Sequence, residues 1–267
     1  MAENGQIRIA LAGNPNCGKT TMFNNITGAK QHVGNYPGVT VEKKEGHTSF
    51  DGHELLFIDL PGTYSLTARS LDELVARNVI VNDNPDVIVN VLDASNLERN
   101  LYLAAQLLEL EKPMVIALNM SDVAEDMGIK YDIKKMSELT GATIVSTVGR
   151  TNVGTKELLE ATINVAASQQ APGVTINYGD LLEGKIAELV EALKKSGTVT
   201  YPLRWIAIKL LEKDADVIGK VMRFDNTEAV IQKAEAIREE IKDQVDLDVV
   251  FQEYRHRFAV EVYNTCL

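Results

Sequence analysis

Residues 13–21 of the chain decide its fold, and they read Gly13-Asn14-Pro15-Asn16-Cys17-Gly18-Lys19-Thr20-Thr21. This stretch fits the pattern G-x-x-x-x-G-K-[ST] of a phosphate-binding loop. An apolar run at 7–12 precedes it and indicates a buried strand, and a helix is expected from Lys19 to Thr27. Glycines let backbone N–H groups face an oxyanion, and a helix N-terminus adds partial positive charge. We therefore expect the stretch to cradle phosphates, with Lys19 on the β- and γ-phosphates and the Thr20 hydroxyl on Mg²⁺.

Composition limits the other possibilities. The chain has 267 residues, 45% of them apolar and 24% charged, which is typical of a soluble globular protein of one large or two modest domains. The formal net charge of −11 opposes a broad nucleic-acid surface, so no nucleic-acid partner is expected. The two cysteines, Cys17 and Cys266, lie far apart without metal-ligand spacing. No apolar run approaches the length that spans a membrane.

A second motif follows the predicted strand at 54–58 and reads Asp59-Leu60-Pro61-Gly62. An acidic residue leaving a buried strand, followed two positions later by glycine, is the arrangement that senses a γ-phosphate. We expect Asp59 to hold Mg²⁺, usually through water, and the Gly62 N–H to bond the γ-phosphate. The motif is weak alone, but its place after a phosphate-binding loop strengthens the interpretation.

A third motif, Asn119-Met120-Ser121-Asp122, follows the apolar run 113–118. Asp122 is placed to accept hydrogens from the N1–H and N2–H₂ edge of guanine, which adenine cannot offer. Asn119 is expected to brace the phosphate loop and touch the base. After the predicted strand 142–145, backbone N–H groups are expected to contact the guanine oxygen from a degenerate loop, Ser146-Thr147-Val148-Gly149. The three motifs predict binding of GTP and GDP.

Alternating strands and helices favour an α/β fold with ligand loops at the carboxyl ends of the strands. We predict a P-loop GTPase with a mostly parallel six-stranded sheet flanked by helices, its strands at 7–12, 40–50, 54–58, 87–92, 113–118 and 142–145. Asp51-Gly52 predicts a hairpin that adds one antiparallel edge pair. Residues 29–39 contain two glycines and a proline without periodicity, so they are predicted to be a loop.

Residues 169–174 are typical of a linker, and helical periodicity follows them. We therefore place a GTPase domain at 1–170 and a small all-α helical domain at 171–267. The helical domain contains no recognisable catalytic constellation, and its apolar stripes are interpreted as core.

Finer features of these motifs resemble one family. The stretches 13–20, Val33–Glu42 and Asp59–Leu66 closely resemble the cytosolic GTPase domain of FeoB, the bacterial ferrous iron transporter. Residues 201–212 and 254–258 resemble the helical, GDI-like part of the same family, which acts on guanine-nucleotide release and precedes a membrane region. The resemblance implies a soluble N-terminal portion that works at the cytoplasmic face of the inner membrane. It implies as partners the transporter's own membrane domain, which is missing here, and a second copy through the switch regions.

The resemblance also implies residue roles. Gly38, Val39 and Thr40 fall in the first switch, where Thr40 would bind Mg²⁺ only when the γ-phosphate is present. Thr63 stands where Ras-like enzymes hold a water-positioning glutamine, so no catalytic glutamine is expected. In this family a K⁺ ion offsets the transition-state charge. Its ligands here would be the Asn16 side chain and the carbonyls of Gly34 and Tyr36. The catalytic set is then Lys19, Asn16, Thr40 and Gly62.

The roles of two residues and the function of the chain remain open on sequence grounds. Asn16 could be a loop-stabilising residue instead of a K⁺ ligand. Cys17, which replaces the usual Ser or Ala, could be a reactive thiol near Lys19 instead of a small filler. The main prediction is a Mg²⁺-dependent, K⁺-stimulated GTPase that gates or regulates Fe²⁺ uptake. Its rivals are a soluble GTPase of the Era or TrmE kind and a slow GTP-dependent binding switch.

Overall fold

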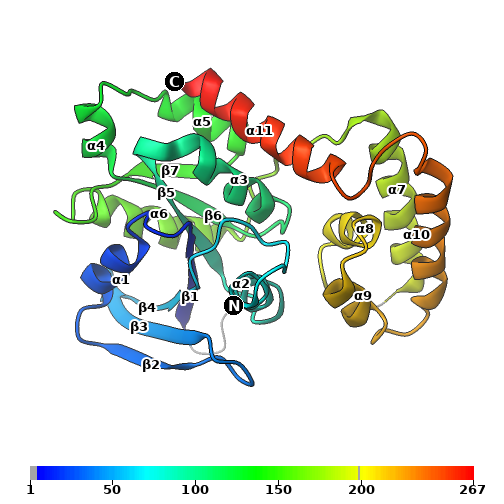
Figure 1. The fold of residues 1–267 in the computed structure, drawn as a ribbon. Helices are drawn as coiled ribbons and strands as arrows, with labels where there is room; N and C mark the ends of the chain where they lie inside the picture. Colours follow the sequence, from blue (N-terminus) through cyan, green and yellow to red (C-terminus); the bar gives the residue numbers. More distant parts are fainter. Residues whose placement is uncertain (1–4, 198) are drawn as a thin grey trace. The chain divides into compact units, whose positions relative to one another are not determined.

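The structure, a computed structural model, describes residues 5–197 and 199–267 (Figure 1). The chain divides into two compact units: Met1–Val174 with Ala259–Leu267, and Thr175–Phe258. The end of the chain groups with the first unit because the Asp132 N–H donates to the Cys266 carbonyl at 2.8 Å and Tyr263 packs on Tyr131. This division differs from the predicted boundary at 170/171 and from the predicted assignment of the whole C-terminal stretch to the helical domain. None of the described helices is long and apolar enough to cross a membrane.

The first unit is built on a seven-stranded sheet of order β2-β3-β4-β1-β5-β6-β7. The strands are β1 (Gln6–Gly13), β2 (Gln31–Asn35), β3 (Glu42–Phe50), β4 (His53–Asp59), β5 (Val87–Asp93), β6 (Met114–Asn119) and β7 (Thr143–Ser146). The helices of this unit are α1 (Lys19–Thr27), α2 (Leu71–Asn82), the 3₁₀ helix η1 (Ala94–Asn96), α3 (Leu97–Leu108), α4 (Ser121–Asp126), α5 (Ile133–Thr140) and α6 (Thr155–Ser168). This α/β architecture agrees with the predicted fold class.

The sheet contains one strand more than predicted. β1 pairs in parallel with β4 and β5, and β5, β6 and β7 continue in parallel. β3 pairs antiparallel with β4, and β2 pairs antiparallel with β3. The prediction of a loop over 29–39 was therefore wrong for residues 31–35. β2 is a polar edge strand that buries no face, so it lacks the apolar alternation by which a strand is recognised in a sequence.

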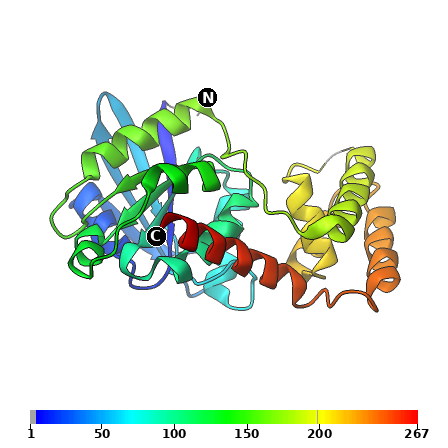
Figure 2. The same cartoon turned by 90° about the horizontal axis from the view of Figure 1, so that it is seen from above.

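The core explains why the site lies where it does. Val87, Val89 and Val91 of β5 pack against one layer that includes Phe23 of α1 and Leu158 of α6. Helices α2 and α3 pack on the sheet through β1 and β5 and are drawn on the side opposite α1 and α6 (Figures 1 and 2). A parallel sheet covered on both faces leaves only the ends of its strands open to a ligand.

The second unit is helical. It contains α7 (Gly179–Ser196), α8 (Leu203–Leu211), α9 (Ala215–Val221), α10 (Glu228–Ile241) and the first part of α11 (Val250–Cys266). Each of α7, α8 and α10 contacts the other two. Their buried side chains follow the predicted apolar stripes, among them Ile186, Leu189, Trp205, Ile208 and Ile237.

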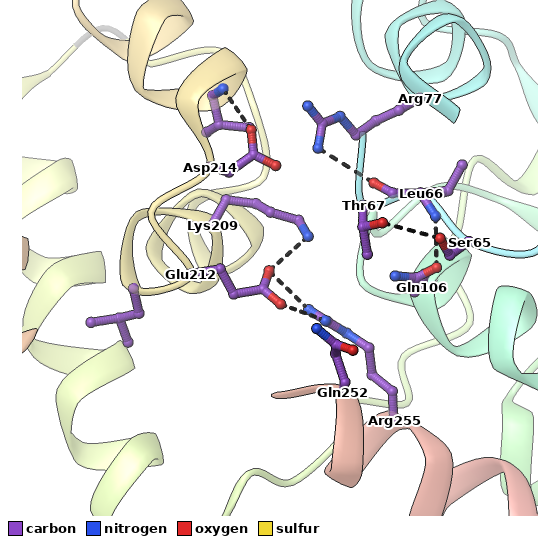
Figure 3. A network of polar contacts seen from close by, with 12 residues as sticks. Ser65, Leu66, Thr67, Arg77, Gln106, Lys209, Glu212, Asp214, Gln252 and Arg255 are labelled. Carbon is purple, nitrogen blue, oxygen red and sulfur yellow. Dashed lines mark hydrogen bonds and ion pairs between the residues drawn. The ribbon is translucent and has the colours of Figure 1, made fainter. Parts of the chain in front are cut away.

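A buried ionic cluster ties α8 to α11 inside this unit. Glu212 accepts hydrogen bonds from Lys209 at 2.7 Å and from Arg255 at 2.6 Å, and Arg255 is completely buried (Figure 3). Burial alone would raise the pKa of Glu212, but the attraction of Lys209 and Arg255 outweighs it and lowers the pKa from 4.5 to about 2. The cluster therefore stabilises the fold while Glu212 is charged.

We expect Glu212→Gln to destabilise the helical unit at pH 7 by on the order of 3 kcal/mol, because it leaves Arg255 buried without its carboxylate. A depressed folded-state pKa stabilises above the unfolded pKa, so the difference between variant and parent should shrink as pH falls from 4.5 towards 2. Urea unfolding followed by the fluorescence of Trp205, the single tryptophan, measures both effects. The exposed pair Lys242–Glu239 supplies the control Glu239→Gln, which should change little. A pH-independent loss in Glu212→Gln would contradict the assignment.

Candidate functional site

The loop between β1 and α1 is shaped by two glycines that admit no side chain. A Cβ on Gly13 would lie 2.7 Å from both the Cys17 Sγ and the Val91 carbonyl oxygen. Gly18 precedes α1 with a φ of 87° in the left-handed region, and a Cβ there would run into the Asn119 side chain. The loop therefore packs against Val91 of β5 and Asn119 of β6, and helix α1 begins immediately after it at Lys19.

Lys19 joins this loop to the second motif. Its ammonium group forms a buried ion pair with Asp59 and donates to the Leu60 carbonyl at 2.7 Å. Burial raises the pKa of Asp59 above its ordinary value. The neighbouring cations Lys19 and Lys44 act to lower it, but burial is the larger effect. Each of these two charged groups could exchange its partner for a ligand of opposite charge. A phosphate would suit the lysine, and a divalent cation would suit the carboxylate.

The segment that follows Asp59 lies against the loop. The Leu60 N–H donates to the Leu11 carbonyl at 3.0 Å, and the Thr63 N–H donates to the Gly13 carbonyl at 3.2 Å. A Cβ on Gly62 would touch the Pro15 backbone at 3.4 Å. Gly62 therefore sits beside the phosphate-binding loop, where its N–H could face the same ligand.

Two residues that hold this segment were missed by the sequence analysis. The Gln106 side-chain oxygen on α3 accepts the Leu66 N–H at 2.7 Å, and Arg77 on α2 donates to the Leu66 carbonyl at 3.3 Å (Figure 3). Both side chains are buried. They lie in helices whose sequence pattern reports only apolar packing, so no motif identified them.

Asn119 connects the first loop to the loop after β7. Its Nδ2 donates to the Cys17 carbonyl at 2.9 Å, and its Oδ1 accepts from Thr147 Oγ1 at 3.2 Å and from the Gly149 N–H at 2.8 Å. The amide is buried, so these contacts fix the loops on both sides of it. Ser146, Thr147 and Val148 are thereby brought to the same edge of the sheet as the phosphate-binding loop.

Asp122 lies in the first turn of α4, which Met120 precedes in the left-handed conformation. Its Oδ2 accepts from Arg150 Nη2 at 2.6 Å. Asp122 is the residue predicted to bind guanine, whereas no sequence motif gives Arg150 a role.

The residues predicted to form the first switch lie in β2 and in the turn that follows it. The Tyr36 ring is buried, which raises the pKa of its hydroxyl, and its N–H donates to the Val41 carbonyl at 2.9 Å. The Val39 N–H donates to the Tyr36 carbonyl at 3.2 Å, so residues 36–41 form a turn at the end of β2. Thr40 is exposed, and within the described residues no hydrogen bond joins it to Lys19, Thr20 or Asp59. Gly34 is paired with Lys43 in the β2–β3 ladder, and Gly38 lies exposed in the turn.

The acidic, histidine and cysteine side chains of the described residues are dispersed rather than clustered. In the part of the chain that the structure describes, no three His, Cys, Asp or Glu residues gather in a group that could hold a metal ion. The candidate metal oxygens of the site are those of Thr20 and Asp59, with Thr40 separate from them.

Comparisons with known proteins agree on one family. A family model described as ferrous iron transport protein B matches residues 7–162, and a model described as the FeoB cytosolic helical domain matches residues 178–267. The Fe(2+) transport protein A/Fe(2+) transporter FeoB fusion protein of Porphyromonas gingivalis is 45% identical over 216 residues, 79% of this chain and 26% of that protein. The Fe(2+) transporter FeoB of Escherichia coli strain K12 is 41% identical over 213 residues, 78% of this chain and 27% of that protein. The chain thus spans about a quarter of the length of these relatives.

Solved structures of similar length also match. A mutant of S. thermophilus NFeoB bound to GDP gives a TM-score of 0.89 at 36% identity, covering 98% of this chain and 99% of that chain. The cytosolic domain of T. maritima FeoB in its GMPPNP form gives a TM-score of 0.85 at 31% identity, covering 97% of this chain and 98% of that chain.

Cys17 belongs to the core of the first unit. Its side chain is 1% exposed and packs among the apolar residues beneath the sheet. Burial raises the pKa of its thiol to about 11, more than the nearby Lys19 lowers it. The structure therefore favours the small filler over the reactive thiol.

We expect the native protein to react very slowly with an aromatic disulfide reagent at pH 8, because a thiol with a pKa near 11 carries little thiolate and Cys17 is covered. Urea-unfolded protein should react at both cysteines within the mixing time. The variant Cys266→Ser isolates the signal of Cys17. Rapid labelling of native Cys266→Ser, measured by absorbance of the released thiolate, would show that Cys17 is accessible.

Proposed function

Because the chain belongs to the family of ferrous iron transport protein B, we propose that it binds GTP and hydrolyses it to GDP and phosphate. One observation carries this proposal. Lys19, Asp59, Gly62 and Asn119 come from separate parts of the sequence and meet at the carboxyl edge of the sheet. Two related structures are a GDP-bound form and a GMPPNP form, which agrees with a guanine nucleotide at this edge.

The residues of the site would divide the nucleotide between them. The backbone from Gly13 to Thr21 would cradle the phosphates, and Lys19 would exchange its ion pair with Asp59 for the β- and γ-phosphate oxygens. Asp122 would accept the guanine edge, while Asn119 would hold the loops around it. Val148 and its neighbours would face the base from the loop after β7.

The donor set fits Mg²⁺, because a hydroxyl and carboxylates are the hard oxygen ligands this ion prefers. Thr20 is exposed at the start of α1, and Asp59 is a buried carboxylate balanced only by cations on its own chain. Bound Mg²⁺ would neutralise charge on the β- and γ-phosphates. Thr40 would have to move from its exposed turn to join these two residues, which is the order–disorder behaviour expected of a switch.

Hydrolysis would proceed by attack of water on the γ-phosphate, without a covalent intermediate. The Gly62 N–H would hold a γ-phosphate oxygen from beside Pro15. Thr63 is buried and tied to Gly13, so we assign it no part in orienting the water. The chain therefore needs another source of charge stabilisation between the β- and γ-phosphates.

We propose that K⁺ supplies this stabilisation at Asn16 and at the carbonyls of Gly34 and Tyr36. The Asn16 side chain is exposed and makes no hydrogen bond to any described residue, which opposes a purely loop-stabilising role. The Tyr36 carbonyl accepts one hydrogen bond from Val39 and keeps a second lone pair. By analogy with its longer relatives, hydrolysis would gate or regulate Fe²⁺ uptake by an attached membrane domain at the cytoplasmic face. A slow binding switch is the alternative that turnover measurements would decide.

Asp122→Asn should weaken binding of GDP and GTP by roughly 10- to 100-fold, because the amide replaces a carboxylate that accepts two hydrogen bonds from guanine. Titration with a fluorescent guanine nucleotide measures the loss. Asp126→Asn makes the same change of charge in an exposed position of the same helix and should leave the affinity unchanged. Full guanine affinity in Asp122→Asn would refute the base assignment.

GTP turnover should be faster in KCl than in NaCl of equal ionic strength by about tenfold or more, as expected for loss of one transition-state charge contact. Asn16→Ala should lower turnover in KCl to the NaCl rate while GDP affinity stays nearly the same. Phosphate release under both salts measures this. Equal rates in the two salts would remove the K⁺ assignment, and negligible turnover in both with intact GTP binding would favour the slow switch.

A further inference from the structure

The loop after β7 places a cation on the carboxylate assigned to guanine. Arg150 Nη2 lies 2.6 Å from Asp122 Oδ2. The Arg150 side chain is 72% exposed and that of Asp122 is 25% exposed, so the arginine reaches from solvent to a largely covered carboxylate.

The backbone beneath Arg150 is held in place. The neighbouring Gly149 donates its N–H to Asn119 at 2.8 Å and receives a hydrogen bond from Asn25 at 2.5 Å. The Thr151 N–H on the other side donates to the Val148 carbonyl at 3.1 Å. The arginine side chain can therefore swing between Asp122 and solvent while its anchor stays fixed.

The chemistry of the contact resembles that of the base. A guanidinium group presents parallel N–H donors in a planar fork, which suits a carboxylate. The N1–H and N2–H₂ edge of guanine is itself a guanidine fragment with the same fork of donors. Arg150 thus offers Asp122 the same kind of partner that the nucleotide would offer.

We propose that Arg150 is an internal competitor of guanine: it pairs with Asp122 when the base is absent and must leave before the base can bind. This inference rests on the proposed function, because it takes Asp122 as the guanine-binding carboxylate. Because both partners compete for one carboxylate, the free energy of the Arg150–Asp122 pair is subtracted from that of guanine binding. Arg150 thereby sets the fraction of molecules in which Asp122 is free, and with it the rate at which nucleotide enters.

The expected size follows from the exposure of the pair. Exposed ion pairs contribute little, so removal of Arg150 should accelerate association of GDP by about two- to fivefold. The rate of dissociation should stay unchanged, because the arginine has already left Asp122 in the complex. Screening should remove the difference, so the gain should be present at about 0.05 M salt and lost at about 0.5 M.

The experiment is stopped-flow binding of mant-GDP to the protein and to Arg150→Met, which keeps an unbranched side chain without the charge. Lys135→Met removes an equal charge from an exposed pair with Glu138 on α5, and so reports the general attraction of the nucleotide to cations. Faster association in Arg150→Met than in both the parent and Lys135→Met would support the proposal. Equal association, or faster dissociation in Arg150→Met, would overturn it, because Arg150 would then be incidental or would hold the base.

A second background separates this inference from the proposed function. In Asp122→Asn, the amide can donate to the C2 carbonyl of xanthine, so mant-XDP becomes the probe and Arg150 has no carboxylate to occupy. Arg150→Met should then have no effect on association, and a persisting effect would overturn the competition. If Asp122→Asn binds mant-GDP as well as the parent does, the base assignment fails, whatever Arg150 does.

Discussion

The buried amide of Asn119 is the contact on which the site depends. It bonds the Cys17 carbonyl on one side and Thr147 and Gly149 on the other, so one side chain sets the spacing of two loops. The same amide lies where a side chain on Gly18 would have to go, which fixes the left-handed turn before α1. Buried polar groups are costly unless every bond is made, and this one makes three. The loop between β1 and α1 and the loop after β7 are therefore held together by contacts within the chain.

The charged groups beside the phosphate-binding loop are already paired within the chain. Lys19 at the start of α1 and Asp59 at the end of β4 neutralise one another. In the proposed complex, a nucleotide and its cation would each offer one of these two groups a new partner of opposite charge. Asp122, the carboxylate proposed to bind guanine, is likewise paired within the chain, with Arg150. A chain with a net charge of −11 gains from such pairing, because unpaired carboxylates would repel a polyphosphate.

Much of this arrangement could be predicted from the sequence, and the reasons for the rest are physical. Gly13, Lys19, Asp59 and Asn119 stand at fixed offsets from apolar runs, and the ends of parallel strands meet at one edge of the sheet. β2 escaped prediction because its pairing with β3 uses the backbone alone. Gln106 and Arg150 escaped because each acts through a tertiary contact that no local pattern records. The contacts that accompany the grouping of the last residues with the first unit, among them a backbone bond from Asp132 and a ring contact of Tyr131, are equally invisible in the sequence.

The hydrogen bonds of Gln106 and Arg77 to the Leu66 backbone restrict the movement of the segment that follows Asp59. Thr63 is tied to Gly13, and Leu66 is tied to α2 and α3, so only Tyr64 and Ser65 lie between two anchored points. The three backbone steps from Thr63 to Leu66 span at most about 11 Å, so the two anchors limit how far this segment can travel. Gly62 directly precedes this segment, so a displacement of Gly62 strains first the bond between Thr63 and Gly13. A displacement that carries the whole segment away also has to break the bonds at Leu66, so helices α2 and α3 add to the stiffness of the chain beside the phosphate-binding loop.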